Sequence, residues 1–260
     1  MEPTIAHPSP VQVIGRVSEC VRRLMEVGLT YEALQKPIDD PIMRKRLVNF
    51  WLSGGFEATT SQKRSREIMG KNFFGVEEAI KFFGVNPTRQ QLIIFSKIPF
   101  SEAVLEQLKN THVLVAVFPL SILEIRDKVE RKLFRSHKEA MYNQQFFARE
   151  HGEISWQLVC KTPVENSTAK DWSEQQALLG QDDEVPIAQV MVYTIIGLYL
   201  ATGERIFKDL YVRTSSLSCP RLNHANVGSF SSYNLGLDIN IFWGGERFEF
   251  LGVSSARKSQ

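Results

Sequence analysis

The C-terminal stretch of residues 211–258 constrains the fold of this chain more than any other part of the sequence. It reads YVRTSSLSCPRLNHANVGSFSSYNLGLDINIFWGGERFEFLGVSSARK, in which short apolar runs alternate with Ser, Asn and Gly. Short apolar runs that are separated by turn-favouring residues predict several short strands joined by turns, and they argue against a long helix.

The same stretch has an unusual composition. Residues 214–242 contain no Lys, Gln, Glu, Met or Trp, although these five types make up 59 of the 260 residues. A window of that length should hold about six of them on composition alone. Ser, Asn, Gly and Tyr, which replace them, are favoured in binding loops because they combine adaptable hydrogen bonding with a large contact area. An ordinary strand-rich end of a domain is the alternative interpretation.

The sequence before residue 140 predicts a mainly helical region. Apolar spacing, N-cap residues and Gly stops predict helices at residues 11–27, 31–35, 41–52, 76–83, 88–95, 101–109 and 121–134. The polar run 59–66 is expected to be a loop or an exposed helix start. The run VLVAVF at 113–118 predicts a buried strand. Pairs of phenylalanines at 73–74, 82–83 and 146–147 are expected to belong to the core, with a stacking platform for bases as the alternative.

From residue 141 onward the pattern changes to an α+β domain. A strand is expected within 154–164, and Asp171 with Glu174 has capping-box spacing at the start of a short helix. Pro186 precedes an amphipathic helix that ends at Gly203. The expected organisation is therefore a helical region at 1–140 and an α+β domain at 141–260.

Charge and cysteine content limit the class of protein. The 31 basic and 29 acidic residues are well mixed and give a net charge of +2, which argues against a nucleic-acid-binding protein. The basic residues at 63–66 form one local cluster, for which a solvated surface is the favoured explanation. Three cysteines (Cys20, Cys160 and Cys219) without metal-ligand spacing favour a reducing compartment. No signal peptide or membrane-spanning run is found, so a cytoplasmic location is expected.

Motifs for catalysis and for metal binding are absent. The chain has no phosphate-binding glycine loop, no GxSxG, no HExxH and no CxxC. Ser218, His224 and Asp238 lie in one stretch, but their proximity in the sequence does not establish a catalytic triad. The three acidic residues at 182–184 are expected to be solvated. We therefore expect no enzymatic activity, no metal site and no cofactor.

Several segments together resemble the variable proteins of diversity-generating retroelements. They are EVPIAQVMVYTIIGLYLATGERIF, YVRTSS, VGSF, LGLDINIFW and the ending LGVSSARK, and the upstream segment IPFSEAVLEQLKNTHVLVAVFPLSILEIRDKV is also similar. The resemblance implies a C-type-lectin-like domain at 141–260, in which two helices pack on short antiparallel strands, with a variable tail at 214–250. It also implies that adenines are randomised, chiefly in Asn codons, which can never yield Lys, Gln, Glu, Met or Trp.

The resemblance separates a fixed frame from positions that vary. The frame would comprise Val227, Gly228, Phe230, Gly236, Leu237, Trp243, Arg247 and residues 251–258. The candidate variable, ligand-binding positions would be Ser218, Pro220, Leu222, His224, Asn226, Ser229, Ser231, Tyr233, Asp238, Asn240, Phe242, Phe248 and Phe250. Gly244 and Gly245 stand where the family usually has acidic residues, and an Asn codon cannot yield Glu246 or Glu249. The last loop is therefore expected to be partly fixed.

These expectations describe a non-enzymatic protein that binds a macromolecular ligand, with a protein favoured because aromatic side chains dominate such interfaces. The sequence specifies neither the identity of the ligand nor the oligomeric state. Three alternatives are a structural or regulatory α+β protein without a variable surface, an enzyme related to the lectin-like formylglycine-generating class, and nucleic-acid binding by the N-terminal region. The enzyme would need a reactive cysteine pair, which Cys219 alone does not supply.

Overall fold

The chain divides into two compact units, Met1–Gly55 and Phe56–Gln260. The computed structural model describes residues 10–52, 56–135, 141–218, 223–231 and 236–259. The domain boundary expected between residues 140 and 141 falls inside the second unit. The strand predicted at 113–118 is β2 (His112–Val117), and it pairs along its whole length with β3 (Ser155–Cys160). Residues on both sides of the expected boundary therefore belong to one sheet.

The described part of the first unit is helical. It contains α1 (Pro10–Glu26), α2 (Tyr31–Asp39) and α3 (Pro41–Leu52), in agreement with the helices predicted from apolar spacing. Thr30 begins α2, because its hydroxyl accepts a hydrogen bond from the backbone N–H of Ala33. Within residues 13–51, none of the described side chains is buried.

The second unit is a mixed α+β structure, which confirms the predicted class. Its helices are α4 (Thr60–Met69), α5 (Val76–Phe83), α6 (Arg89–Phe95), α7 (Glu102–Leu108), α8 (Ile122–Lys128), α9 (Phe146–Arg149), α10 (Trp172–Gln176) and α11 (Ala188–Thr202), with 3₁₀ turns η1 (Gly70–Asn72), η2 (Arg131–Leu133) and η3 (Met141–Gln144). Its remaining strands are β1 (Phe73–Phe74), β4 (Asp183–Glu184), β5 (Tyr211–Leu217), β6 (Asn223–Gly228), β7 (Asp238–Trp243), β8 (Leu251–Val253) and β9 (Ala256–Arg257).

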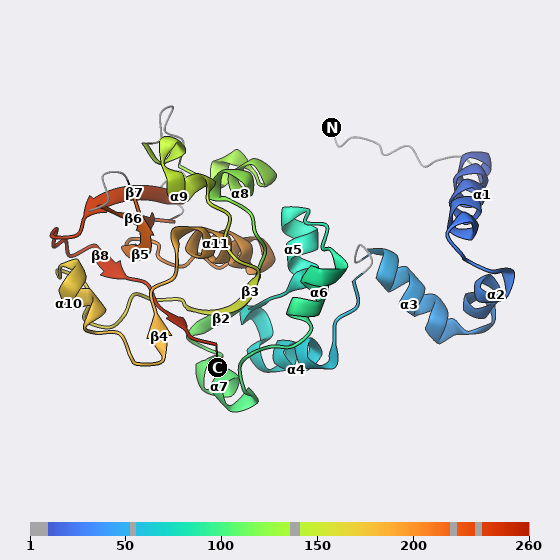
Figure 1. Cartoon of the computed structure of the whole chain (residues 1–260), viewed down its shortest axis with the longest axis horizontal. Helices are drawn as coiled ribbons and strands as arrows, with labels where there is room; N and C mark the ends of the chain where they lie inside the picture. Colours follow the sequence, from blue (N-terminus) through green and yellow to red (C-terminus); the bar gives the residue numbers. More distant parts are fainter. Residues whose placement is uncertain (1–9, 53–55, 136–140, 219–222, 232–235, 260) are drawn as a thin grey trace. The chain divides into compact units, whose positions relative to one another are not determined.

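The strands form two sheets (Figure 1). One has the order β1-β2-β3-β9-β4, and the other has the order β7-β6-β5-β8. The pairs β1–β2 and β5–β8 are parallel, and the other pairs are antiparallel. The C-terminal stretch forms β5 to β9, so the prediction of several short strands is confirmed. Its last strand, β9, leaves the four-stranded sheet and lies between β3 and β4.

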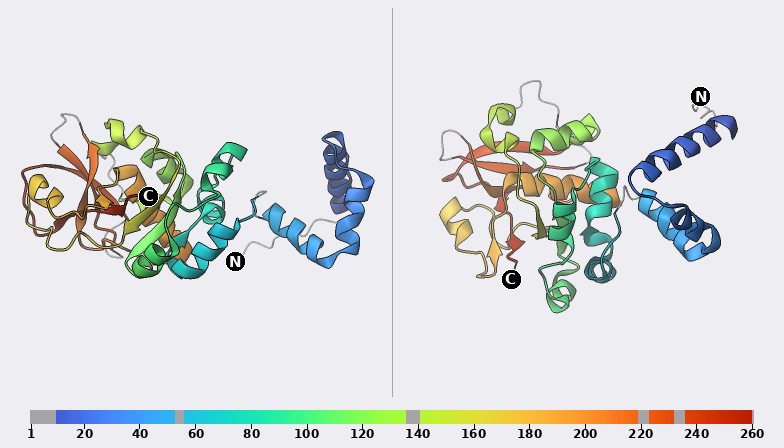
Figure 2. Two further views of the ribbon diagram at one scale, coloured as in Figure 1. Left: turned by 60° about the horizontal axis from the view of Figure 1, so that its bottom comes forward. Right: turned by 45° about the vertical axis from the view of Figure 1, so that its right-hand side comes forward.

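Helix α11 lies between the two sheets (Figures 1 and 2) and contacts β1 and β2 of one sheet and β5 and β6 of the other. Its residues from Ala188 to Leu198 are all buried, so the helix is enclosed and does not have the exposed polar face of an amphipathic helix. Two of its buried polar side chains donate hydrogen bonds within the protein: the Gln189 amide donates to the carbonyl of Phe118, and the Thr194 hydroxyl donates to the carbonyl of Val190.

The predicted N-caps are confirmed, since the side chains of Thr88, Ser101 and Asp171 each accept a backbone hydrogen bond in the first turn of α6, α7 and α10. The polar run at 59–66, expected to be a loop or an exposed helix start, is a helix start: it begins α4 with a capping box between Thr59 and Gln62. It is exposed only in part, because Gln62 and Ser65 are buried. The helix predicted at 121–134 is shorter than expected, since it ends at Lys128 and is followed by η2.

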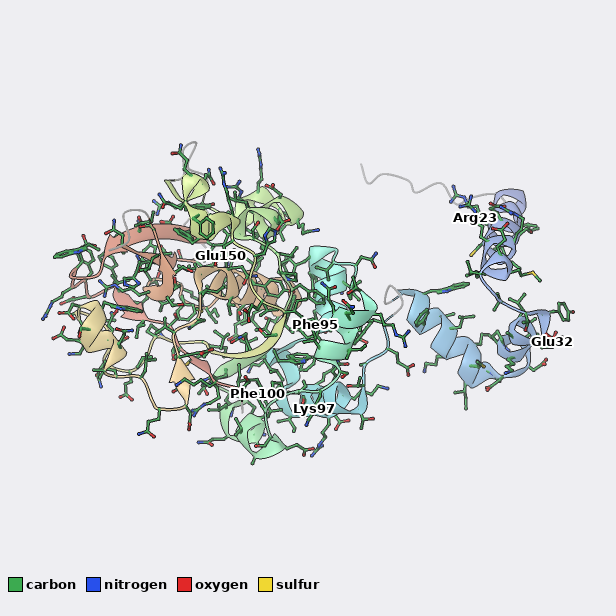
Figure 3. All side chains as sticks on the ribbon, viewed as in Figure 1. Arg23, Glu32, Phe95, Lys97, Phe100 and Glu150 are labelled. Atoms are coloured by element: carbon green, nitrogen blue, oxygen red, sulfur yellow. The ribbon has the colours of Figure 1, made fainter. Side chains whose placement is uncertain are left out.

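The aromatic pairs lie in the core, with one exception. Phe74 and Phe83 are buried and pack against Tyr193 of α11. Phe95, labelled in Figure 3, packs against Phe118 and Trp156. Phe146 is the exception, because it is largely exposed. Buried rings cannot stack on bases, so the structure does not favour the alternative that these phenylalanines form a stacking platform.

Candidate ligand-binding face

The register between β6 and β7 determines which candidate side chains lie together. His224 pairs with Phe242, Asn226 with Asn240, and Gly228 with Asp238. Directly paired residues project from the same face of a sheet, so five candidate positions of these two strands share one face. The intervening residues Ala225, Val227, Ile239 and Ile241 project from the other face and pack in or against the core. We call the face that carries His224, Asn226, Asp238, Asn240 and Phe242 the candidate face.

Strand β5 adds two residues to the candidate face. Tyr211 pairs with Gly228 and Arg213 with Asn226, whereas Val212 between them packs in the core. The register shifts between Arg213 and Leu217, which is paired with His224. Tyr211 and Arg213 were not among the predicted site residues. Because alternate residues of a strand lie on the same face, a strand predicted at 211–213 could have assigned both residues to one face.

Four aromatic rings form a cluster on the candidate face. Phe248 and Phe250 are stacked with ring centroids 4.9 Å apart, and Phe242 lies 5.6 Å from Phe248 and 6.2 Å from Phe250. Tyr211 lies 5.8 Å from Phe242 in an edge-to-face arrangement. Phe250 is 41% exposed, and the other three rings are partly exposed. Such geometry is favourable for aromatic pairs, and it leaves apolar surface for a partner.

Asp238 is buried beside this cluster and has charged and neutral partners. Its Oδ2 accepts a hydrogen bond from the Tyr211 hydroxyl at 2.5 Å and forms an ion pair with Arg135 at 2.9 Å. Burial and the hydrogen bond to Asp238 together raise the pKa of Tyr211 to about 12. The Arg135 side chain is 42% exposed, so one cation lies at the surface next to the aromatic cluster.

The loop after β7 is anchored by Arg213, whose side chain is fully buried. Its guanidinium donates to the carbonyls of Lys170, Trp243 and Glu246 and to the side-chain oxygen of Gln175. Burial lowers the pKa of Arg213, but the charges of Glu246 and Asp171 oppose this effect. The acceptors are three carbonyls and an amide, so the cation connects two loops to the sheet without a salt bridge to a carboxylate.

Further contacts fix the same loop. The carboxylate of Glu246 accepts a hydrogen bond from the backbone N–H of Trp243, and Arg247 forms ion pairs with Asp171 and Glu174. A side chain at Gly245 would place its Cβ 2.7 Å from the ring of Trp243. Gly245 and Glu246 therefore each have a structural role in this loop, which was expected to be partly fixed.

Six candidate residues are buried, although a side chain that contacts a ligand needs exposed surface. They are Ser218, His224, Asn226, Ser229, Ser231 and Asp238. His224 stacks on Trp172 with ring centroids 3.9 Å apart, and its Nδ1 lies 3.1 Å from the carbonyl of Thr214. Asn226 donates to the carbonyl of His224. The segment around α10 covers this part of the sheet, and no local pattern in β6 indicates that cover.

Four candidates remain at least partly exposed: Asn240, Phe242, Phe248 and Phe250. We call them the exposed set. Pro220, Leu222 and Tyr233, together with Cys219, lie outside the described residues. The exposed set is compact, because the three phenylalanines contact one another and Asn240 precedes Phe242 by two positions on the same face of β7.

Most of the expected frame residues are buried. Val227, Gly228, Phe230, Gly236 and Leu237 have little or no exposed surface. Gly236 has a φ of +109°, and a Cβ there would lie 2.5 Å from the carbonyl carbon of Phe134, so only glycine fits. Trp243 differs, since it is more than half exposed.

The geometry does not assemble a catalytic triad from Ser218, His224 and Asp238. His224 and Asp238 lie at opposite ends of the paired segment of β6 and β7, and each has other partners. Among the described residues, no three His, Cys, Asp or Glu side chains are grouped to hold a metal ion. Asp182 and Asp183 of the acidic run form ion pairs with Arg257.

The basic cluster at 63–66 is neutralised by neighbouring carboxylates. Arg64 forms ion pairs with Glu67 and Glu102, and Arg66 forms them with Glu77 and Glu78. A surface that binds phosphates needs cations without such partners, so this cluster gives little support to nucleic-acid binding.

A cavity of about 370 Å³ lies apart from the candidate face, between α7 and the C-terminal residues. Its lining includes Val104, Leu108, Asp182, Arg257 and Lys258. Arg257 is paired with Asp182 and Asp183, and the Lys258 ammonium donates to the carbonyl of Gln181. Its charged groups are thus engaged within the protein, and none of the candidate residues lines it.

Comparison of the chain with protein-family models, with curated proteins and with solved structures found no match. Within the described ranges, every helix is too short or too polar to cross a membrane.

Proposed function

We propose that this chain is a non-enzymatic ligand-binding protein, a variable protein of a diversity-generating retroelement. Its C-terminal strands would display the diversified surface on a C-type-lectin-like scaffold. The observation that carries the proposal is the arrangement of the candidate face: Asn240, Phe242, Phe248 and Phe250 gather at one partly exposed site beside buried frame residues. A rigid sheet with changeable side chains at its surface is suited to recognition.

The chemistry of the site favours a protein as the ligand. Three phenylalanines and Tyr211 offer a large apolar contact, and Arg135 adds a cation at the edge. Interfaces between proteins concentrate their binding energy in aromatic and arginine side chains. The free thiols of Cys20 and Cys160 are consistent with a reducing compartment, the cytoplasm, as the place of action.

The decisive test is the DNA around the gene. A reverse transcriptase gene should lie nearby, together with a near-copy of the segment that encodes residues 214–250. The two copies should differ at adenines of the template, and the differences should include the codons of the exposed set. They should spare the codons of Val227, Gly228, Phe230 and Gly236. If the near-copy is absent, or if its differences fall on frame codons, the proposal fails.

A binding experiment tests the surface itself. One library would randomise Asn240, Phe242, Phe248 and Phe250, and a control library would randomise four exposed residues of α6, namely Arg89, Gln90, Ile93 and Ile94. Both would be displayed on the full chain and selected against hen lysozyme as the protein probe. We expect at least about tenfold more specific binders from the first library, because its positions adjoin a rigid aromatic site. Equal yields would count against a dedicated binding face.

One observation favours a second candidate, a structural or regulatory α+β protein without a variable surface. Six of the thirteen candidate residues are buried, and His224 and Asn226 make hydrogen bonds within the protein. In that case natural copies of the gene would keep the exposed set constant. Sequencing the gene from several isolates separates the two candidates, since only the first predicts changes concentrated at these codons.

A further inference from the structure

The first unit exposes an apolar stripe along α1. Ile14, Val17, Val21 and Leu24 follow one another at spacings of three, four and three, which places them on one face of the helix. Ile14 is 64% exposed and Val17 is 56% exposed, and the flanking Val13 and Met25 are also exposed. A surface helix normally buries such a stripe against another element.

The rest of the first unit covers this stripe only in part, since Val21 and Leu24 are partly buried whereas Ile14 and Val17 are exposed. The described structure exposes twenty large apolar side chains, and thirteen of them lie in residues 13–51, where no described side chain is buried. An isolated helix of about this length is only marginally stable in water. Exposed apolar surface that no other element covers marks an interaction site.

The charges of the unit limit what can cover the stripe. On α1, Glu19 is paired with Arg22 and with Arg23 (labelled in Figure 3), and Arg22 is also paired with Glu26. Residues 1–55 hold seven Lys and Arg and six Asp and Glu, a net charge of +1. Nucleic acid and anionic lipid both attract concentrated positive charge; α1 has none, and the basic run of the unit, Arg44 to Arg46, lies on α3 and away from the stripe in the sequence. Two copies of such a nearly neutral surface would not repel each other.

The spacing of the stripe fits pairing between identical helices. The four positions correspond to a and d of two heptads, with Ile14 and Val21 at a and with Val17 and Leu24 at d. β-branched residues at a with leucine at d favour two-stranded assemblies, and the second heptad, with Val21 at a and Leu24 at d, has this combination. We infer that the N-terminal unit is a self-association module, in which the stripe of α1 packs against α1 of a second copy of this chain.

The area is sufficient for a stable dimer. Thirteen half-exposed apolar side chains present on the order of 1,000 Å² per copy, compared with roughly 800 Å² per partner in a standard protein interface. Not all of this surface lies on α1, so α2 and α3 would contribute the remainder of the contact. The inference does not depend on the function proposed for the C-terminal face.

The test is the mass of the full chain in solution as a function of concentration. Sedimentation equilibrium should give a mass above the 29.7 kDa of one chain, with dissociation on dilution. Val17→Glu places a charge in the middle of the stripe and should weaken association at least about tenfold. Val17→Leu keeps the stripe apolar and should preserve association.

Gly15→Glu is the matched control. It also adds one negative charge to α1, but on the opposite side of the helix, and a side chain there meets no atom within 4 Å. We expect it to leave association unchanged. Association that Gly15→Glu weakens as much as Val17→Glu would overturn the inference, as would a wild-type chain that stays monomeric at all concentrations. Binding to phosphatidylcholine vesicles by a monomeric chain would show that lipid is the occupant instead.

A cross-link tests whether α1 itself is at the contact. Cys20 is an exposed free thiol next to the stripe, between Val17 and Leu24. A bis-maleimide should join two full chains through this residue, and Cys20→Ser should abolish the joined species without changing the mass in solution. If the cross-link forms equally well in the Cys20→Ser variant, a surface other than α1 mediates the dimer and the inference is wrong.

Discussion

Arg213 links three parts of the chain that are distant in sequence. Its four hydrogen bonds reach the segment before α10, α10 itself and the loop after β7. The loop carries Phe248 and leads to Phe250, so the position of the aromatic cluster depends on a residue that does not belong to it. A buried cation held by neutral acceptors is costly to remove, since each acceptor would lose its donor.

Replacing Arg213 should therefore destabilise the protein strongly. Arg213→Met keeps the apolar stem but removes every donor, and we expect a loss of roughly 3–5 kcal/mol in the free energy of unfolding. Arg247→Met is the control, because Arg247 is half exposed and its ion pairs should contribute less than about 1 kcal/mol. Urea unfolding measures both. Similar losses for the two variants would show that Arg213 is not an anchor.

Tyr211 should make stability depend on alkaline pH. Burial, and next the hydrogen bond to Asp238, raise its pKa in the folded protein to about 12, above the value of about 10 in an unfolded chain. The neutral phenol therefore stabilises the fold fully below pH 10, and this contribution is lost as the pH rises toward 12. Tyr211→Phe should flatten the fall of the unfolding free energy between pH 10 and pH 12. Parallel curves for the two proteins would contradict the assignment.

At the scale of elements, the helices of the second unit were the most predictable part of the sequence. Local signals define them: Thr88, Ser101 and Asp171 supply N-cap acceptors, and Gly203 ends α11 in a left-handed conformation. The short strands β5 to β8 were also foreseeable from apolar runs and turn residues. The pairing of strands in the other sheet was not foreseeable, because β1 pairs with β2 and β9 pairs with β3 across long stretches of the chain.

The burial of His224 and Asn226 on the candidate face could not be predicted either, because it also depends on segments that are far apart in the chain. The alternation of β6 assigns His224 and Asn226 to the face opposite the core, which normally faces solvent. In this fold Trp172 lies against His224, and Ser167 and Gln175 contact β8 of the same sheet. Cover of this kind depends on the path of residues 163–176, which no local pattern in β6 encodes.

Two phenylalanines near the candidate face provide a matched test of frame and surface. Phe230 is fully buried, whereas Phe250 is 41% exposed. Phe230→Ala should cost roughly 3–5 kcal/mol through lost burial and the remaining cavity. Phe250→Ala removes only partial contacts and should cost about 1 kcal/mol. Thermal unfolding followed by circular dichroism compares them. A larger loss of unfolding free energy for Phe250→Ala than for Phe230→Ala would contradict the assignment of Phe230 to the frame and of Phe250 to the exposed set.

At the scale of the whole molecule, the two units should be separable. Phe56–Gln260 has its own continuous core, which includes Phe74, Phe95 and α11. A chain that begins at Phe56 should keep the unfolding temperature of the second unit within a few degrees, and it should be monomeric. Calorimetry and sedimentation measure the two properties. A truncated chain that fails to fold would show that the helices of the first unit are needed for the core of the second.

The position of β9 has a consequence for how such a gene could tolerate mutation. Ala256 and Arg257 lie inside the five-stranded sheet, where they pair with β3 on one side and β4 on the other. A ribosome must therefore translate past the entire candidate variable region before this sheet can close. Copies with a frameshift or a premature stop within that region would lose β9, an internal strand of the sheet, and would be removed by proteolysis. Only copies that are translated in the correct reading frame through residues 214–250 would therefore fold, whether or not a ligand is present.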